Sequence, residues 1–400
     1  MMPPALIDRL QRRALTIGIV FGVGAVIGAI IEPEQFFRSY LVAFMMWLGV
    51  ALGGLALLML QYLTKGNWGF VIRRQLEAAS RTLPLNALLF VPLAIGMWTH
   101  HVYPWAIGLS AEDKLLPKFQ SYMTVHGVIA RAVVYFLLWI IMAFQLNRWG
   151  SWQDQRDEPD MQRSNRYQKL SGPGMILYAL TFTLAAVDWV MSLDSHWYST
   201  MYGFIFIVGQ ALIAMSFMIM LNKALSNYRP VSEIMQKQYW HDLGNLMLAM
   251  IMLFAYMSFS QFLIIWSGNL PEEIEWYLKR FSGGWGVVIV LIALLHFAVP
   301  FFLLLMKSTK RNSQKLVMIA GLMFVMRYID LNWYIMPNFL DPVTHRPAFL
   351  SLAGVVLDLV VPIALGGLWI AAFCRQLKQR PLYPVHDLLW PEITVQHHVH

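Results

Sequence analysis

The chain has 400 residues and a formal net charge of +8, with 58% hydrophobic residues and only 13% charged ones. This composition excludes an ordinary soluble domain, which needs more charged residues to cover its surface. Lys and Arg stand in short patches between apolar runs, which argues against a nucleic-acid partner. With one cysteine, Cys374, the chain alone cannot form an internal disulfide or hold an iron–sulfur cluster or a zinc–thiolate site.

In chain order, ten apolar stretches are long enough to cross a hydrocarbon core, which takes about 20 helical residues. They cover residues 14–32, 40–62, 83–103, 122–145, 173–193, 200–222, 244–267, 285–306, 315–336 and 349–373. No small-residue cleavage pattern follows the first stretch, so we expect it to remain as a helix. The sequence therefore predicts an all-α, polytopic membrane protein with a transmembrane domain over residues 1–373 and a tail over residues 374–400.

One connection has a pattern of its own. Residues 68–83 place Arg73, Arg74, Glu77 and Arg81 opposite an apolar stripe. Such a pattern is typical of a helix that lies in the membrane interface, and a linker with helical character is the alternative.

Basic residues set the expected orientation. Twenty-two of the thirty Lys and Arg residues lie before the first helix, in the even-numbered connections or after the tenth helix, and six lie in the odd-numbered connections. Because cytoplasmic segments carry an excess of Lys and Arg, we expect both termini on the cytoplasmic side.

Ionisable residues within the apolar stretches are the main functional signal. A charge near the bilayer centre costs at least ~2.5 kcal/mol on insertion scales, so such groups persist mainly when they are paired, hydrated or functional. The set that we expect to be buried has seven members: His126, Arg131, Asp188, His296, Arg327, Asp330 and Asp358. A rise of about 1.5 Å per residue puts all of them in the outer half or near the midplane, so we expect one polar cavity that opens outward.

Spacing indicates how these groups pair. Arg327 and Asp330 are three residues apart and share a helix face, so they can form an ion pair. Asp188 and Asp358 have no opposite charge on their own helices, and Arg131 is the natural partner for one of them. Paired carboxylates can be either structural or functional. We expect no metal site.

Two segments look like copies of each other. AVDWVMSL in the fifth helix and RYIDLNWYIMP in the ninth each carry an acid followed within three residues by a tryptophan. Both helices run in the same direction, so the sequence suggests two parallel four-helix repeats.

Three segments also carry a resemblance to a known family. They are AAVDWVMSLDSHWYSTMYG from Ala185 to Gly203, RYIDLNWYIMP in the ninth helix, and GNWGFVIRRQLEAASRTLPL after the second. Together they resemble the ActF subunits of bacterial alternative complex III, within the NrfD and polysulfide-reductase-anchor (PsrC) superfamily. The resemblance implies two four-helix bundles plus a flanking helix pair in a bacterial cytoplasmic membrane. It also implies that Asp188, Arg327 and Asp330 are polar positions of those bundles.

The resemblance further implies a role in respiratory electron transport, as one subunit of a quinol:cytochrome c or electron-acceptor oxidoreductase. The expected partners are an ActC-like membrane subunit that binds menaquinol or another quinol, an iron–sulfur subunit, multihaem cytochrome c subunits and lipids. Haem c and iron–sulfur clusters would belong to those partners, and this chain alone would hold no redox centre and no catalytic residue.

The main hypothesis is therefore a subunit that supports assembly and proton release or translocation through the seven ionisable residues. Two alternatives stay open. One is a quinone-binding subunit with His126 and Asp188 at the head of an apolar slot. The other is a stand-alone secondary transporter with a site at the midplane.

Overall fold

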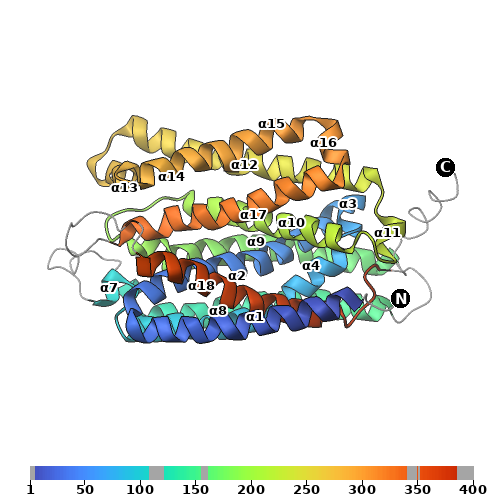
Figure 1. The fold of residues 1–400 in the computed structure, drawn as a ribbon, viewed down its shortest axis with the longest axis horizontal. Helices are drawn as coiled ribbons and strands as arrows, with labels where there is room; N and C mark the ends of the chain where they lie inside the picture. Colours follow the sequence, from blue (N-terminus) through green and yellow to red (C-terminus); the bar gives the residue numbers. More distant parts are fainter. Residues whose placement is uncertain (1–4, 108–120, 155–160, 340–348, 350–351, 385–400) are drawn as a thin grey trace.

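The structure is a computed structural model that describes residues 5–107, 121–154, 161–339, 349 and 352–384. Over these residues the chain forms helices and no strands, and ten helical segments are long and apolar enough to span a membrane. The long helices run side by side along one axis (Figure 1). The chain is an all-α, polytopic membrane protein, as its composition predicts.

The elements follow the chain as α1 (Ala5–Ile31), α2 (Pro33–Thr64), α3 (Asn67–Phe70), α4 (Arg73–Ser80), α5 (Leu83–Leu89), α6 (Val91–Trp98), α7 (Pro104–Ile107), α8 (Val125–Asp154), α9 (Met161–Trp189), η3 (Met191–Leu193), α10 (Tyr202–Leu225), α11 (Val231–Ile234), α12 (Lys237–Gly268), α13 (Pro271–Phe281), α14 (Trp285–Leu291), η4 (Ile292–Ala298), α15 (Val299–Leu305), α16 (Lys307–Arg311), α17 (Ser313–Ile335), η5 (Met336–Asn338) and α18 (Leu352–Leu377). Here η3 and η5 are 3₁₀ turns, and η4 is a π-helix. Each of the ten predicted stretches overlaps one of the spans.

Packing divides these helices into two bundles and a flanking pair. The first bundle contains α2, α4 to α6, α8 and α9, and the second contains α10, α12, the run α14–η4–α15, and α17. Contact between α2 and α10 joins the bundles, and α1 packs along α18, which lies against α2. This arrangement confirms the predicted fold.

Small residues allow the central helices to approach closely. A Cβ atom on Gly53 of α2 would lie 2.0 Å from the carbonyl oxygen of Gln210 on α10. Gly18 of α1 and Gly367 of α18 meet in the same way, since a Cβ on Gly367 would lie 2.4 Å from the backbone nitrogen of Gly18. Close backbone contact of this kind replaces the hydrophobic driving force that lipid does not supply.

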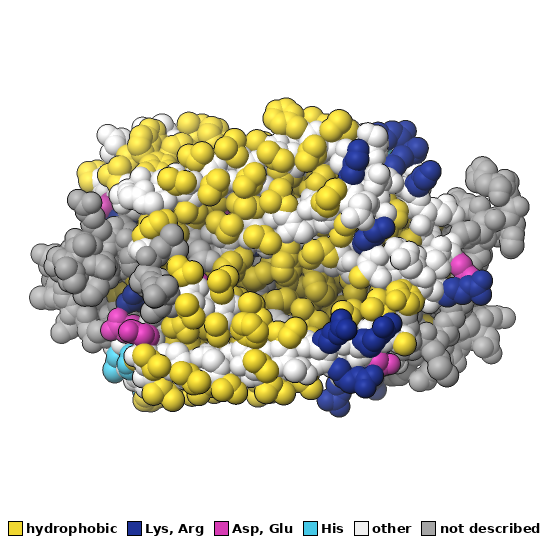
Figure 2. All heavy atoms as spheres, viewed as in Figure 1, with side chains coloured by type: hydrophobic (Ala, Val, Ile, Leu, Met, Phe, Trp, Pro, Cys, Tyr) yellow, Lys and Arg dark blue, Asp and Glu magenta, His cyan; other side chains and the backbone are white. Residues whose placement is uncertain are grey.

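The two ends of the bundle differ in charge. We call the end at which α1 begins and α18 ends the terminal end; Lys378 and Asp8 form a 2.7 Å ion pair there. Lys and Arg side chains gather at this end, while hydrophobic side chains cover the middle of the visible face (Figure 2). At the opposite end, where α9 and α17 finish, Trp197 stacks on Trp276 with ring centroids 4.5 Å apart.

The charged face predicted for a helix over residues 68–83 is buried within the protein. Arg73, Arg74 and Glu77 of α4 are at most 5% exposed, because α4 packs between α2 and α18. Arg74 Nη1 and Arg380 Nη1 lie 2.7 and 3.0 Å from Glu77 Oε2. These ion pairs allow the charged side chains to be buried. Buried ionisable groups therefore occur toward the terminal end as well, whereas the sequence predicted them only in the outer half or near the midplane.

The last helix and the ordered packing after it extend beyond the predicted boundary. Helix α18 runs to Leu377, beyond the predicted boundary at residue 373, and the side chains of Leu382 and Tyr383 are buried. Residues 385–400, with the histidines of the tail, lie outside the described residues.

Candidate functional site

The structure does not gather the seven predicted residues in one cavity. They lie in four places: His126 alone; Arg131 with Asp188; His296 with Arg327 and Asp330; and Asp358 alone. This corrects the expectation of a single shared polar cavity.

Arg131 and Asp188 form a closed ion pair between α8 and α9. Arg131 Nε and Nη2 donate to the two carboxylate oxygens of Asp188 at 2.8 and 2.9 Å, and the Tyr135 hydroxyl donates to Oδ2 at 3.0 Å. The guanidinium also lies 3.7 Å from the ring centroid of Tyr122 and donates to its carbonyl oxygen. Asp188 is wholly buried, whereas the Arg131 side chain is 23% exposed, and the prediction of Arg131 as partner of an acid is confirmed.

The Tyr122 hydroxyl lies beside this ion pair. Burial, and then the Asp188 carboxylate, raise the pKa of Tyr122.

Arg327 and Asp330 form the predicted ion pair on one face of α17. Arg327 Nη1 donates to Asp330 Oδ2, and both residues are about 2% exposed. Gly209 of α10 makes room for the guanidinium, because a Cβ there would lie 2.3 Å from Arg327 Cζ. The rings of Phe206 and Phe254 flank the cation, with centroids 5.2 and 5.5 Å from Cζ.

His296 lies in the π-helix η4, between α14 and α15. Pro300 follows four residues later, so it cannot donate to the His296 carbonyl, and its ring would clash with that carbonyl in a regular α-helix. The wider π-turn relieves this conflict, and such turns recur at functional sites. The imidazole is 2% exposed, and neither ring nitrogen has a hydrogen-bond partner among the residues that the structure describes.

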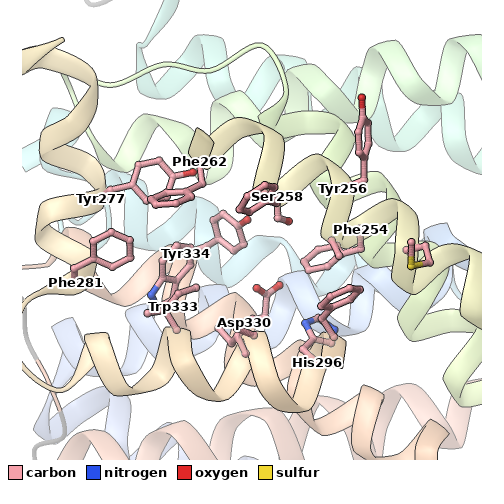
Figure 3. A pocket seen from close by; sticks show the side chains of 17 residues that line it. Phe254, Tyr256, Ser258, Phe262, Tyr277, Phe281, His296, Asp330, Trp333 and Tyr334 are labelled. Atoms are coloured by element: carbon pink, nitrogen blue, oxygen red, sulfur yellow. The ribbon is translucent and has the colours of Figure 1, made fainter. Parts of the chain in front are cut away.

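His296 and Asp330 line one cavity of about 630 Å³ between α12, α13, α14, η4 and α17. Figure 3 shows the Asp330 carboxylate and the His296 ring next to each other, with aromatic side chains around them. The lining is Met252, Phe254, Ala255, Tyr256, Ser258, Phe259, Phe262, Tyr277, Phe281, Ile289, Ile292, Ala293, His296, Phe297, Asp330, Trp333 and Tyr334. An apolar cavity with a few convergent polar groups is the usual form of a binding site.

Sequence reasoning found the two ionisable residues of this cavity and missed its walls. Phe254, Ser258 and Phe262 repeat at four-residue spacing and therefore share a face of α12. That stripe was the available signal, but an aromatic stripe on a membrane helix equally fits contact with lipid.

Both bundles anchor the tryptophan of the repeated motif. In the first bundle, the Tyr103 hydroxyl donates to the Trp189 carbonyl at 2.9 Å. In the second, Arg280 of α13 donates to the Trp333 carbonyl at 3.2 Å and the Tyr334 carbonyl at 2.8 Å. Burial lowers the pKa of Arg280 to about 10, so the guanidinium is still charged at neutral pH, where it favours the C-terminal end of α17.

Asp358 stands apart on α18. Its Oδ1 accepts from the Ser39 hydroxyl at 2.5 Å, and the Tyr328 hydroxyl donates to its carbonyl. Within the described part of the chain, no Lys or Arg forms an ion pair with it. Asp358 and Arg13 both line a second cavity of about 540 Å³, which shares no lining residue with the first.

His126 is exposed and meets the ring of Trp98 edge-on, with centroids 4.8 Å apart. Asp188 is wholly buried and bonded to Arg131 and Tyr135, and among the described residues no hydrogen bond joins it to the exposed His126.

The sequence was compared with known protein families and with curated proteins. No model of a known protein family matches the chain, and a search of curated proteins finds no significant match.

Proposed function

We propose that this chain is a membrane subunit of a quinol-oxidising respiratory complex of the alternative complex III type, and that its second bundle handles protons. The resemblance of its motifs to ActF subunits supports the choice of complex. The chain would lie in a bacterial cytoplasmic membrane with the terminal end on the cytoplasmic side, which is supported by the Lys and Arg residues at that end.

The observation that carries the proton role is the buried imidazole of His296, whose nitrogens have no hydrogen-bond partner within the described part of the chain, in the same cavity as the Asp330 carboxylate. A neutral imidazole accepts a proton at one nitrogen and releases one from the other, which suits a relay. In the Arg131–Asp188 pair, both carboxylate oxygens of Asp188 already accept hydrogen bonds from Arg131 and Tyr135. The second bundle is therefore the better candidate for proton exchange.

Purification tests the choice of complex. The chain is tagged in its native host and isolated in mild detergent, and associated subunits are identified by mass spectrometry and by the haem c absorbance spectrum. We expect an iron–sulfur subunit and multihaem cytochromes to accompany it. A chain that purifies alone contradicts membership of the complex.

Proton release tests the role of the site. Asp330→Asn should lower the number of protons released per quinol oxidised while the subunits stay together. Glu275→Gln is the matched control, since the Glu275 side chain is 64% exposed on α13. An intact complex with an unchanged proton count in Asp330→Asn would show that the Arg327–Asp330 pair is structural.

A further inference from the structure

The second cavity, of about 540 Å³, is a groove lined by α1, α2, α17 and α18. Its floor is buried, since Met46 and Trp47 of α2 are each 6% exposed. Its edges are open: Ile17 of α1, Val325 of α17 and Leu359 of α18 are 45%, 55% and 57% exposed, and all three lie within apolar spans. Whatever fills the groove must therefore come from the membrane or from a neighbouring protein within it.

Polar groups inside the groove already have partners within the protein. Trp47 Nε1 donates to the Pro362 carbonyl at 3.0 Å, and the Tyr328 hydroxyl donates to the Asp358 carbonyl. Asp358 Oδ1 accepts from the Ser39 hydroxyl at 2.5 Å. Because these groups are matched internally, an apolar occupant leaves none of their bonds unmade, and the middle of the groove suits a hydrocarbon chain.

The dimensions of the groove fit one extended chain. Its lining residues on α18 run from Asp358 to Ile370, which spans about 18 Å at a rise of about 1.5 Å per residue. Half of a hydrocarbon core of about 30 Å is about 15 Å, so the groove is roughly as long as one leaflet is thick. A volume of about 540 Å³ over this length gives a mean cross-section of about 30 Å², whereas a helix with its side chains, roughly 10 Å wide, needs about 80 Å². A transmembrane helix of a partner is therefore too wide to enter the groove.

One end of the groove carries a positive charge. Arg13 lines it and directly precedes the apolar stretch that begins at Ala14, which puts the guanidinium at the border of the hydrocarbon core. Among the described residues no carboxylate forms an ion pair with Arg13, and Asp8, on the same helix, pairs with Lys378. Arg9 is exposed one turn further toward the terminal end, where Lys and Arg side chains gather (Figure 2). This end of the groove therefore attracts an anion.

We infer that the groove binds an anionic diacyl phospholipid from the leaflet at the terminal end, with its phosphate against Arg13 and one acyl chain along α18. Basic pockets between transmembrane helices are typical sites for such headgroups, and a guanidinium can donate two hydrogen bonds to one phosphate. A zwitterionic lipid has the same phosphate but brings an ammonium group next to the guanidinium, so it should bind less tightly. This groove shares no lining residue with the cavity of the second bundle, so lipid binding here is independent of the proposed function.

Native mass spectrometry of the full-length chain in dodecyl maltoside measures this binding. Phosphatidylglycerol and phosphatidylethanolamine with identical acyl chains are titrated separately, and lipid-free and lipid-bound masses are counted. Arg13→Gln removes the charge, and Arg375→Gln is its control, since Arg375 is exposed in the last turn of α18 and does not line the groove. Ile363→Trp narrows the groove, and Val356→Trp is its control, since Val356 is 51% exposed on the same helix and does not line the groove.

We expect the first phosphatidylglycerol to bind about fivefold more tightly than the first phosphatidylethanolamine, which is the effect of one arginine near the membrane surface. Arg13→Gln should reduce this preference to below about twofold, and Ile363→Trp should weaken the binding of both lipids by about fivefold or more, while each control changes binding by less than about twofold. Equal binding of the two lipids to the unaltered chain, or a preference that survives Arg13→Gln, overturns the phosphate contact. Unaltered binding in Ile363→Trp overturns the groove as the place of the acyl chain.

Discussion

The first bundle holds the Asp188 carboxylate between two helices, whereas the second holds the Asp330 carboxylate on the same helix as its arginine. Both acids lie near the end of a long helix that is followed by a 3₁₀ turn, and both precede a tryptophan whose carbonyl accepts a side-chain hydrogen bond. The two halves therefore share a framework and differ in how the acid is matched.

The difference has a physical consequence. In the first bundle, Arg131 and Tyr135 use both carboxylate oxygens of Asp188, which is wholly buried. In the second bundle, the ion pair lies on one face of α17. Asp330 also lines an open cavity, and His296 lies in the wall of that cavity. Similar buried charges thus stabilise the first bundle and leave the second bundle able to exchange protons or bind a ligand.

Arg131→Leu should give the largest loss of stability, because it leaves Asp188 buried without its cation. Removing one partner of a buried ion pair costs about 3 to 5 kcal/mol. We expect a loss of that size in the free energy of unfolding, measured by titrating SDS into mixed micelles and following helicity by circular dichroism.

The double variant Arg131→Leu/Asp188→Leu should recover much of this loss, since it buries no unmatched charge. If the single variant loses less than about 1 kcal/mol, as surface pairs do, the pair does not stabilise the first bundle.

Arg280→Met should have the next largest effect. The guanidinium donates to the Trp333 and Tyr334 carbonyls of α17, to Asn338 Oδ1 in η5 and to the Trp276 carbonyl of its own helix. Hydrogen bonds that involve a charged group contribute about 1.5 to 3 kcal/mol each, and the desolvation cost of the buried guanidinium offsets part of their sum, so we expect a net loss of about 2 to 3 kcal/mol. Tyr103→Phe removes one neutral bond at the matching place in the first bundle, so about 1 kcal/mol is expected there. Equal losses of stability for Arg280→Met and Tyr103→Phe in the same unfolding assay would show that the ends of α9 and α17 are held equally strongly, which contradicts this prediction.

Gly209→Ala should destabilise the second bundle by about 1 to 3 kcal/mol, as overpacking does, because the new methyl group overlaps Arg327. Gly321→Ala is the control on α17: its methyl group would meet only the Met220 sulfur, at 3.9 Å. Both changes raise helix propensity, so the difference between them isolates the overlap. A Gly209→Ala protein as stable as the control would show that the guanidinium moves aside freely.

Features that depend on a single helix could be predicted from the sequence. Ten spans follow from apolar length, and the Arg327–Asp330 pair follows from a spacing of three residues on one helix. Neither requires knowledge of which helices are neighbours.

The remaining features depend on the direction in which a side chain points across the bundle. Counting residues along a helix gives a depth in the membrane, but it does not show whether the His126 side chain is buried. In the structure it is exposed on the surface of the bundle. Likewise, the polar face of α4 was expected to meet water, yet Arg380 from the far end of the chain covers Glu77. The cavity combines walls from several helices, so no single stretch of sequence shows it.

His296→Leu should change stability least and activity most clearly. Replacing a buried polar group that has no partner by an apolar one is close to neutral, so we expect a change within about 1 kcal/mol. Loss of a proton relay should nevertheless lower quinol-dependent proton release by about tenfold or more, since positioned acid–base groups contribute about 10² to 10⁴ in rate. Phe297→Leu, in the same π-helix and on the same cavity, removes a ring without removing a titratable group.

The control should therefore keep most of its proton release, measured with a pH-sensitive dye in proteoliposomes. A His296→Leu protein that loses more than about 2 kcal/mol but releases protons normally would mean that the imidazole supports packing, as buried groups in cores do. In that case both bundles would use their buried polar groups for stability, and the cavity of the second bundle would have to act through its shape and its aromatic walls alone.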